Sequence, residues 1–173
     1  MRKLGIWLLV LMCLAGCAAE PDYETVADLP AEPVIAQAME MVVDLPAQTV
    51  VGVMESGEGS TLYFAEDYTV CLQTLEAGDL NRTLEVCTGF SRDRLQLMQT
   101  KAGEWDRYEA GWSCVSDQGD QIGRICVLDD GKYHYALTLM TLASQAEHVQ
   151  ESWQALLRSF RLELPGTQVN SGS

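Results

Sequence analysis

The side chains that could do chemistry in this 173-residue chain are mostly thiols, because it has six cysteines and only two histidines. Thiolates can be acylated, joined in disulfides or bound to zinc. Imidazoles can act as general bases or metal ligands. Cys13 and Cys17 lie near the N-terminus, and the other four cysteines lie in the body of the chain. Which of these reactions applies depends first on whether the chain is exported.

The N-terminal segment has the composition of an export signal. Arg2 and Lys3 precede an apolar run over residues 4–11, which is shorter than the roughly 20 residues that a membrane-spanning helix needs. The run leads into Leu14-Ala15-Gly16-Cys17, which resembles the lipobox of bacterial lipoproteins. The resemblance implies cleavage immediately before the cysteine and transfer of a diacylglyceryl group to its thiol. An ordinary signal peptide, or a membrane-buried stretch that contains Cys17, is the alternative.

The lipobox sets the expected organisation of the chain. We expect residues 1–16 to be removed and Cys17 to hold the protein by membrane lipid, on the extracytoplasmic side of the cell membrane. Residues 17–33 are rich in proline and acidic side chains and have few apolar ones to bury, so they are expected to be a tether. Residues 34–164 are expected to form one domain, and residues 165–173 a disordered tail.

Charge limits the possible partners. The whole chain carries 11 basic and 25 acidic residues. Without residues 1–16 it loses two basic side chains and no acidic one, which leaves nine against 25 and a formal charge of −16. Such a domain repels phosphate backbones, so we expect no nucleic-acid binding. The acids are scattered, which is typical of a solvated surface; a cationic partner or divalent ions are the alternatives.

Export leaves an even number of thiols in the domain, which favours disulfides: Cys71, Cys87, Cys114 and Cys126. Three pairings are possible. We expect the first to pair with the second and the third with the fourth, because each pair brackets a turn signal, around Asp79 in one and Asp120 in the other. An odd-length turn at these points would set the two cysteines on opposite strands, within disulfide reach.

Other uses of these residues are weaker. The cysteine spacings of 16, 27 and 12 residues contain no Cys-x-x-Cys and match no zinc motif, so no metal site is expected. Free thiols remain an alternative to disulfides. Oxygen-rich turns can hold calcium, but turns also favour aspartate for backbone reasons alone. The acidic turns in question contain Asp117, Asp120, Asp129 and Asp130.

The two histidines are the candidates for acid–base catalysis. His134 lies between two tyrosines on an expected strand, and His148 lies in an expected helix. A triad would have to use one of them, yet no Gly-x-Ser-x-Gly elbow is present. The many carboxylates could supply a hydrolytic pair, although nothing singles one out. No cofactor motif is found. A small tethered hydrolase that uses His134 or a carboxylate pair is therefore the alternative function.

Most of the domain alternates between apolar and polar residues, which predicts β-strands. Asp130-Gly131 between two such runs predicts a two-residue hairpin turn. The expected strands cover residues 39–43, 50–54, 62–64, 68–72, 84–87, 95–98, 108–114, 122–128 and 133–142.

Only one segment has a convincing helical pattern. Ser144 and Glu147 fit a capping box, and apolar residues follow at helical spacing from Val149 to Phe160. The helix is expected over Ser144–Arg158. Alternation returns from Phe160 to Leu164, which predicts a final strand.

This C-terminal part carries a second resemblance. A strand with Tyr133, Tyr135 and Leu137, then an amphipathic helix, then the run from Leu156 to Leu162 are similar to the ending of PsbP/Mog1-like domains and of small uncharacterised lipoproteins from Gram-positive anaerobes. The resemblance implies an α+β fold, in which an antiparallel β-sheet has the C-terminal amphipathic helix packed on one face. The chain lacks a clear second helix.

These observations favour a non-catalytic binding or accessory module. The expected partner is another envelope or secreted protein, because the tether holds the domain near its neighbours and raises their effective concentration. The expected contact surface is the sheet face that the helix over Ser144–Arg158 does not cover.

Overall fold

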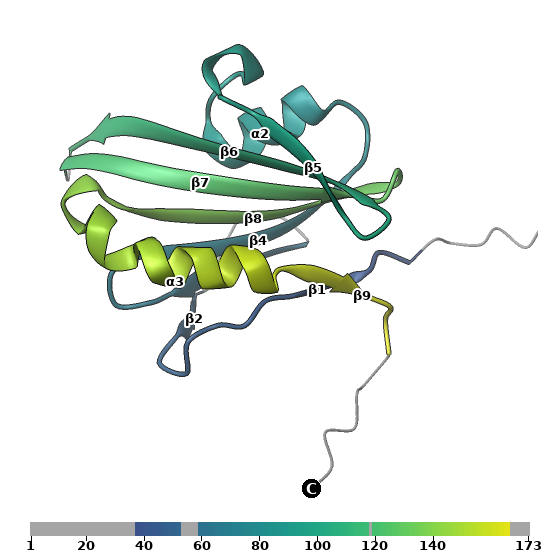
Figure 1. Ribbon diagram of the computed structural model, residues 1–173, viewed down its shortest axis with the longest axis horizontal. Helices are drawn as coiled ribbons and strands as arrows, with labels where there is room; N and C mark the ends of the chain where they lie inside the picture. Colours follow the sequence, from purple (N-terminus) through teal and green to yellow (C-terminus); the bar gives the residue numbers. More distant parts are fainter. Residues whose placement is uncertain (1–36, 53–58, 118, 167–173) are drawn as a thin grey trace, which may run out of the picture. The chain divides into compact units, whose positions relative to one another are not determined.

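The computed structural model describes residues 37–52, 59–117 and 119–166 (Figure 1). The lipobox with Cys17, the whole of the expected tether and most of the expected tail lie outside the described residues. No helix in the described part is long and apolar enough to cross a membrane.

The described residues form an α+β fold built on antiparallel strands, as predicted. Seven strands make one sheet in the order β2-β3-β4-β8-β7-β6-β5, and β1 pairs separately with β9. The strands of the large sheet are β2 Val50–Gly52, β3 Ser60–Phe64, β4 Thr69–Glu76, β5 Met98–Ala102, β6 Trp105–Ser116, β7 Gly119–Asp129 and β8 Tyr133–Leu142. The other elements are β1 Glu40–Val42, α2 Leu80–Thr88, η1 Arg92–Arg94, η2 Ala143–Gln145, α3 Ala146–Ser159 and β9 Arg161–Glu163.

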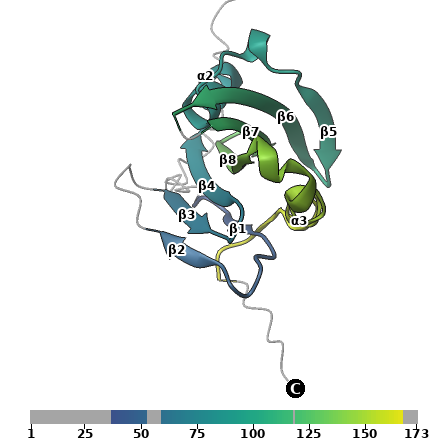
Figure 2. The ribbon, with the colours of Figure 1, turned by 90° about the vertical axis from the view of Figure 1, so that its left-hand side faces the viewer.

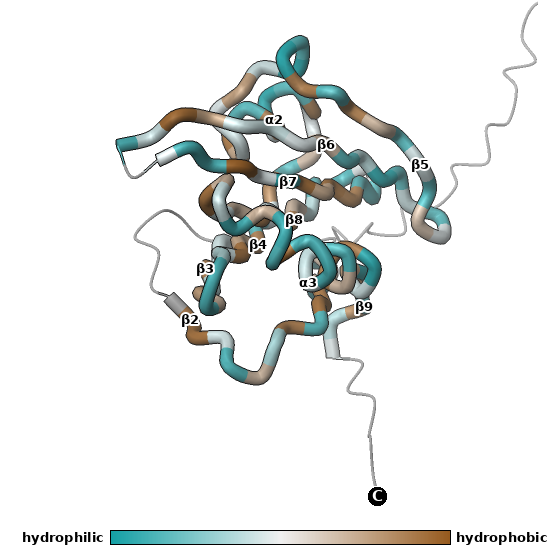
Figure 3. The backbone as a smooth tube through the Cα atoms, turned by 60° about the vertical axis from the view of Figure 1, so that its left-hand side comes forward, coloured by the Kyte–Doolittle hydropathy of each residue, from teal (hydrophilic) through white to brown (hydrophobic). Residues whose placement is uncertain are grey.

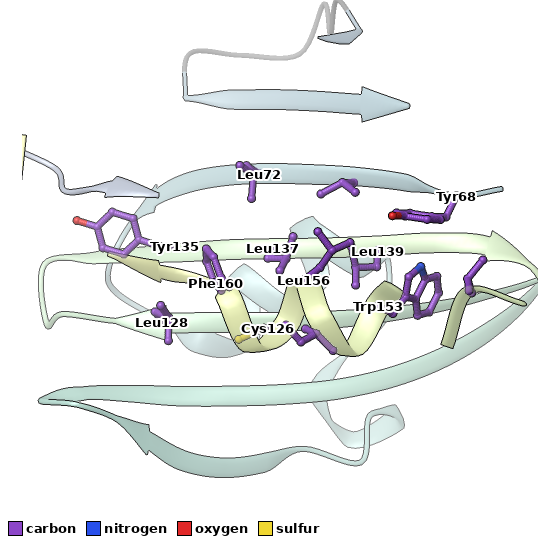
Figure 4. Packing of buried hydrophobic residues seen from close by; sticks show 13 residues of the cluster. Tyr68, Leu72, Cys126, Leu128, Tyr135, Leu137, Leu139, Trp153, Leu156 and Phe160 are labelled. Carbon is purple, nitrogen blue, oxygen red and sulfur yellow. The ribbon is translucent and has the colours of Figure 1, made fainter. Parts of the chain in front are cut away.

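Helix α3 covers one face of the sheet, as the sequence predicted (Figure 1). In Figure 3 hydrophobic and hydrophilic residues alternate along α3, because its apolar residues recur every third or fourth position. The Trp153 ring meets Tyr68 edge-on, with the ring centres 6.5 Å apart. Figure 4 shows this core, which includes Tyr68, Val70, Leu72, Cys126, Leu128, Tyr135, Leu137, Leu139, Val149, Trp153, Leu156, Leu157 and Phe160.

The start of α3 differs from the expectation. The chain passes from β8 through the 3₁₀ turn η2, and Gln145 precedes the helix without a side-chain cap. The capping box at Ser144 is therefore wrong. An N-cap residue needs an extended backbone, and Ser144 already lies inside the 3₁₀ turn.

The expected strand over residues 84–87 is also wrong, because these residues belong to helix α2. Asp79 accepts a hydrogen bond from the backbone N–H of Asn81, at 2.9 Å, and caps the helix start. Gly89 ends the helix in the left-handed conformation, with φ 75°. Helix α2 lies on the sheet face opposite α3 (Figure 2). The core beneath it comprises Leu84, Leu95, Ala110, Ile125, Val127 and Ala136.

Candidate functional site

His134 belongs to an array of three polar side chains, of which His134 and Thr83 are buried and Asp129 is partly exposed. Its Nδ1 lies 2.7 Å from Oγ1 of Thr83, and its Nε2 lies 3.5 Å from Oδ2 of Asp129. Asp129 is its direct partner across the β7–β8 hairpin, while Thr83 comes from the first turn of α2. With the ring proton on Nε2, the Thr83 hydroxyl donates to Nδ1 and the carboxylate orients the ring. A hydroxyl, a base and an orienting acid follow one another, as in hydrolytic triads.

The array is closed to substrate in this structure. His134 is 2% exposed and Thr83 is 4% exposed, so a scissile carbonyl cannot approach the hydroxyl. What the array does is hold α2 against β8 by a hydrogen bond between residues 51 positions apart. His148 lies exposed on α3, across the sheet from His134, so the two histidines do not form one site.

The strand register is incompatible with the expected pairing of Cys114 with Cys126. Cys114 lies opposite Gln121, and Cys126 lies opposite Glu109. The β6–β7 loop contains only two residues, between Ser116 and Gly119, so the turn is not centred on Asp120. The two cysteines consequently point to opposite faces. Burial beneath α3 raises the pKa of the Cys126 thiol to about 12.

Cys71 and Cys87 are related differently from the expectation. Asp79 caps a helix rather than centring a hairpin, so Cys87 lies on α2 and not on a strand opposite Cys71. Cys71 nevertheless lies between Val70 and Leu72 on β4, and those two side chains face α3. Successive side chains of a strand point to opposite faces, so Cys71 points toward the α2 side. Burial raises the pKa of the Cys87 thiol to about 12, and charge on Cys71 contributes. Their disulfide stays a prediction, now as a link between β4 and α2.

The acidic turn between β7 and β8 uses its carboxylates to organise its own backbone. Oδ1 of Asp130 accepts hydrogen bonds from the N–H groups of Lys132 and Tyr133, at 2.8 and 2.6 Å. Its Oδ2 accepts one from the Tyr135 hydroxyl at 2.9 Å. Burial alone would raise the pKa of Asp130, but these hydrogen bonds lower it below its usual value. The described residues contain no group of three metal-ligating side chains, including at the calcium candidates.

The outer edge of β6 is only partly paired. The strand runs over Trp105–Ser116, but β5 pairs only with its first five residues, ending at Glu109 opposite Met98. Within the described part of the chain, no strand pairs with that edge beyond Glu109. Figure 1 shows β6 continuing past β5.

A cavity of about 730 Å³ lies along this unpaired edge, and we call it the edge groove. Residues that point to either face of β6 line it, so it follows the edge rather than one face. One wall comes from the chain between α2 and β5, where the Arg94 guanidinium lies 5.0 Å from the centre of the Phe90 ring. The groove is lined by two basic residues, one acidic residue and a set of aromatic, small and other neutral residues: Phe90, Arg94, Gln96, Met98, Glu109, Ala110, Gly111, Trp112, Ser113, Gly123 and Arg124.

Two glycines shape the floor of the edge groove. Gly123 lies opposite Trp112, and a Cβ added to Gly123 would overlap the indole ring. The indole therefore lies flat across Gly123, which only glycine permits. Gly111 is different, because a Cβ there would meet just one atom, the Gly123 carbonyl oxygen, at 3.6 Å. Neither glycine contact could be predicted from the sequence, because each joins residues on two different strands.

Comparison with known proteins identifies the fold. No protein-family model matches the chain, and no curated protein matches it. The solved structure of cyanobacterial PsbP (CyanoP) from Synechocystis sp. PCC 6803 is similar, with 10% identity and a TM-score of 0.53, over 72% of this chain and 92% of that chain. A mutant of the protein Mog1 is similar with 11% identity and a TM-score of 0.50, over 72% and 92%. The chain has the PsbP/Mog1-like α+β fold, as predicted.

Proposed function

We propose that the protein is a lipid-anchored binding module of the cell envelope that acts without catalysis. The observation that carries this proposal is the edge groove, a hollow of about 730 Å³ beside an unpaired strand edge. Its lining combines aromatic and small residues with two arginines and one glutamate, which suits recognition of another protein. The lipobox at Leu14–Cys17 supports attachment through Cys17. Attachment confines the domain near its partner and raises their effective concentration.

The groove also changes where we expect binding. The face opposite α3 was the expected contact surface, but α2 covers its centre through the core around Leu84. What stays open on that side lies next to Phe90 and Trp112, in the edge groove.

A small hydrolase is the second candidate, because Thr83, His134 and Asp129 have a catalytic order of groups. Reaching Thr83 would require α2 to move, since both partners are buried. A cavity of about 590 Å³ lies next to Thr83. If α2 moved, substrate could reach the Thr83 hydroxyl from this cavity.

The test compares the full-length protein in detergent with its Thr83→Val and His134→Ala variants on ester, peptide and glycoside substrates. A binding module shows no turnover in any of the three. Turnover by the wild type that is lost in both variants would replace the binding proposal with the hydrolase. In parallel, photo-crosslinking from Trp112 in intact cells should join the protein to a specific envelope protein, whereas crosslinking from exposed Val50 on β2 should not.

A further inference from the structure

We propose that β6 binds an extended, acidic peptide segment of a partner protein by β-strand addition in the edge groove. The inference rests on the proposed binding function and names the class of partner. Main-chain hydrogen bonds to an unpaired edge would supply affinity, and side chains at alternate positions would supply specificity.

The backbone of β6 has donors and acceptors pointing outward. In a two-residue hairpin, the residues that close the loop form a hydrogen-bonded pair, and such pairs recur at every second residue. Ser116 closes the β6–β7 loop with Gly119, so Ser116 and every second residue before it bond to β7. The intervening residues, Gly111, Ser113 and Val115, direct their N–H and C=O groups away from β7. All three residues are exposed.

The hairpin at the other end of β6 independently predicts the same set of outward-bonding residues. Ala102 and Trp105 close the two-residue β5–β6 loop, so Glu109 must bond outward to Met98. Gly111 is then the next outward residue, without a strand partner in the described chain. From there to the end of β6 the edge extends for roughly 20 Å, which accommodates a strand of ordinary length.

This edge lacks the charged side chains and prolines that commonly protect against strand pairing. Exposed edges are commonly blocked by lysine, proline or inward-pointing charges. Residues 110–116 contain no charged residue and no proline, in a chain with 36 charged residues. Val115, near the end of the open stretch, is 86% exposed. An edge kept uncharged in so charged a protein is suited to strand pairing.

Two arginines make the groove selective for carboxylates. Arg124 lies opposite Gly111, which has no side chain, and a Cβ there would meet only the Gly123 carbonyl oxygen, so the backbone beside Arg124 is open at the edge. Its Nη2 lies 3.9 Å from Oε2 of Glu109, so this ion pair is loose, while Arg107 binds the same carboxylate at 2.7 Å. Arg94 is exposed, and in the described part of the chain it has no ion pair with a carboxylate.

The acidic surface of the protein does not exclude an acidic segment. At physiological ionic strength, charges separated by more than about 8 Å are largely screened, so the arginines within the groove dominate locally. An added strand would place one acidic side chain across Gly111 toward Arg124. On the other face, a residue would lie next to Trp112, Phe90 and Arg94, where an apolar or acidic side chain fits.

The probe is a labelled seven-residue peptide of alternating valine and glutamate, titrated against the full-length protein in detergent. We expect saturable binding that is about tenfold weaker for the same peptide with lysine in place of glutamate, which is the effect of losing one charge-assisted hydrogen bond. N-methylation of every second peptide amide, in the set that faces β6, should abolish binding. These amides donate the main-chain hydrogen bonds to β6. Equal binding of the glutamate and lysine peptides would overturn the acidic specificity.

Variants locate the site. Ser113→Pro removes an outward N–H without removing a β6–β7 hydrogen bond, and it should abolish peptide binding at an unchanged circular dichroism spectrum. Arg124→Gln keeps the backbone intact and should weaken binding about tenfold. Arg161→Gln is the matched control, because Arg161 is exposed on β9, and it should bind as the wild type does. Wild-type affinity in Ser113→Pro would overturn strand addition at β6.

The outcomes also separate this inference from the proposed function. If crosslinking from Trp112 captures an envelope protein equally well in wild type and Ser113→Pro, the binding function stands and strand addition is overturned. Self-association that Ser113→Pro abolishes, without peptide binding, would show a second copy as the occupant and would likewise overturn the proposal. Substrate turnover dependent on Thr83 would overturn the proposed function itself.

Discussion

At the scale of single residues, Gly123 is the position where one added methyl group has the largest consequence. Gly123→Ala would force the Trp112 indole off the β7 backbone, at a cost of about 1–3 kcal/mol in unfolding free energy. Urea denaturation measures the loss. Gly111→Ala is the matched control on β6, because its Cβ has space, and its unfolding midpoint should stay near that of the wild type. Equal midpoints for both variants would contradict the stacked indole.

Asp130 should make stability depend on pH. Hydrogen bonds hold the pKa of its carboxyl below the usual value, so its contribution is fully present above the unfolded pKa of about 3.9. The contribution is lost as pH falls through the lower, folded pKa. Asp130→Asn should therefore be less stable than wild type at pH 7, and the gap should narrow below about pH 4. Urea midpoints at pH 7 and pH 3 test this, and a gap that widens in acid would contradict it.

At the scale of elements, the hydrogen bond between Thr83 and His134 fastens α2 to the sheet. Thr83→Val leaves Nδ1 of buried His134 without its partner, which should cost about 1–3 kcal/mol. Hydrogen exchange should speed up in α2 more than in α3. Thr100→Val on exposed β5 is the control and should change neither quantity. Unchanged exchange in the Thr83 variant would contradict the clamp.

A disulfide between β4 and α2 is the element-scale prediction for the cysteines. Peptide mapping of the exported protein under non-reducing conditions should find Cys71 joined to Cys87. The strand register predicts that Cys114 and Cys126 will not be joined to each other, since they lie on opposite faces. Recovery of a Cys114–Cys126 peptide would contradict the register, and recovery of Cys87 only as a thiol would contradict the disulfide.

At the scale of the whole molecule, Cys17 is expected to decide where the domain resides. Cys17→Ser should release the protein from membranes or leave it unprocessed. Two acyl chains, each contributing about 0.8 kcal/mol per buried methylene, are needed for stable anchoring. Membrane fractionation with immunoblotting measures this, and Cys13→Ser is the control that should remain anchored. A Cys17→Ser protein of mature size in the membrane fraction would rule out the lipobox.

The strong local patterns were sufficient for much of the fold. Alternation predicted β7 and β8, and apolar residues at helical spacing predicted α3 with its buried Trp153. Helix α2 was missed although Leu80, Leu84 and Cys87 share one face and Gly89 ends it. Its nine residues are too few for a clear helical period, and the run from Leu84 to Cys87 resembles a short strand.

The candidate site depended on contacts between distant residues. His134 could be named from its type, but its partner Thr83 lies 51 positions away. The open edge of β6 could not be named at all, because it depends on where β5 stops pairing. Sequence by itself determined the strand-rich fold class, the covering helix and the acidic charge, since these follow from local period and composition. Only the tertiary structure decided the open edge, the buried array and the cysteine neighbours, because strand register and helix packing are set by long-range contacts.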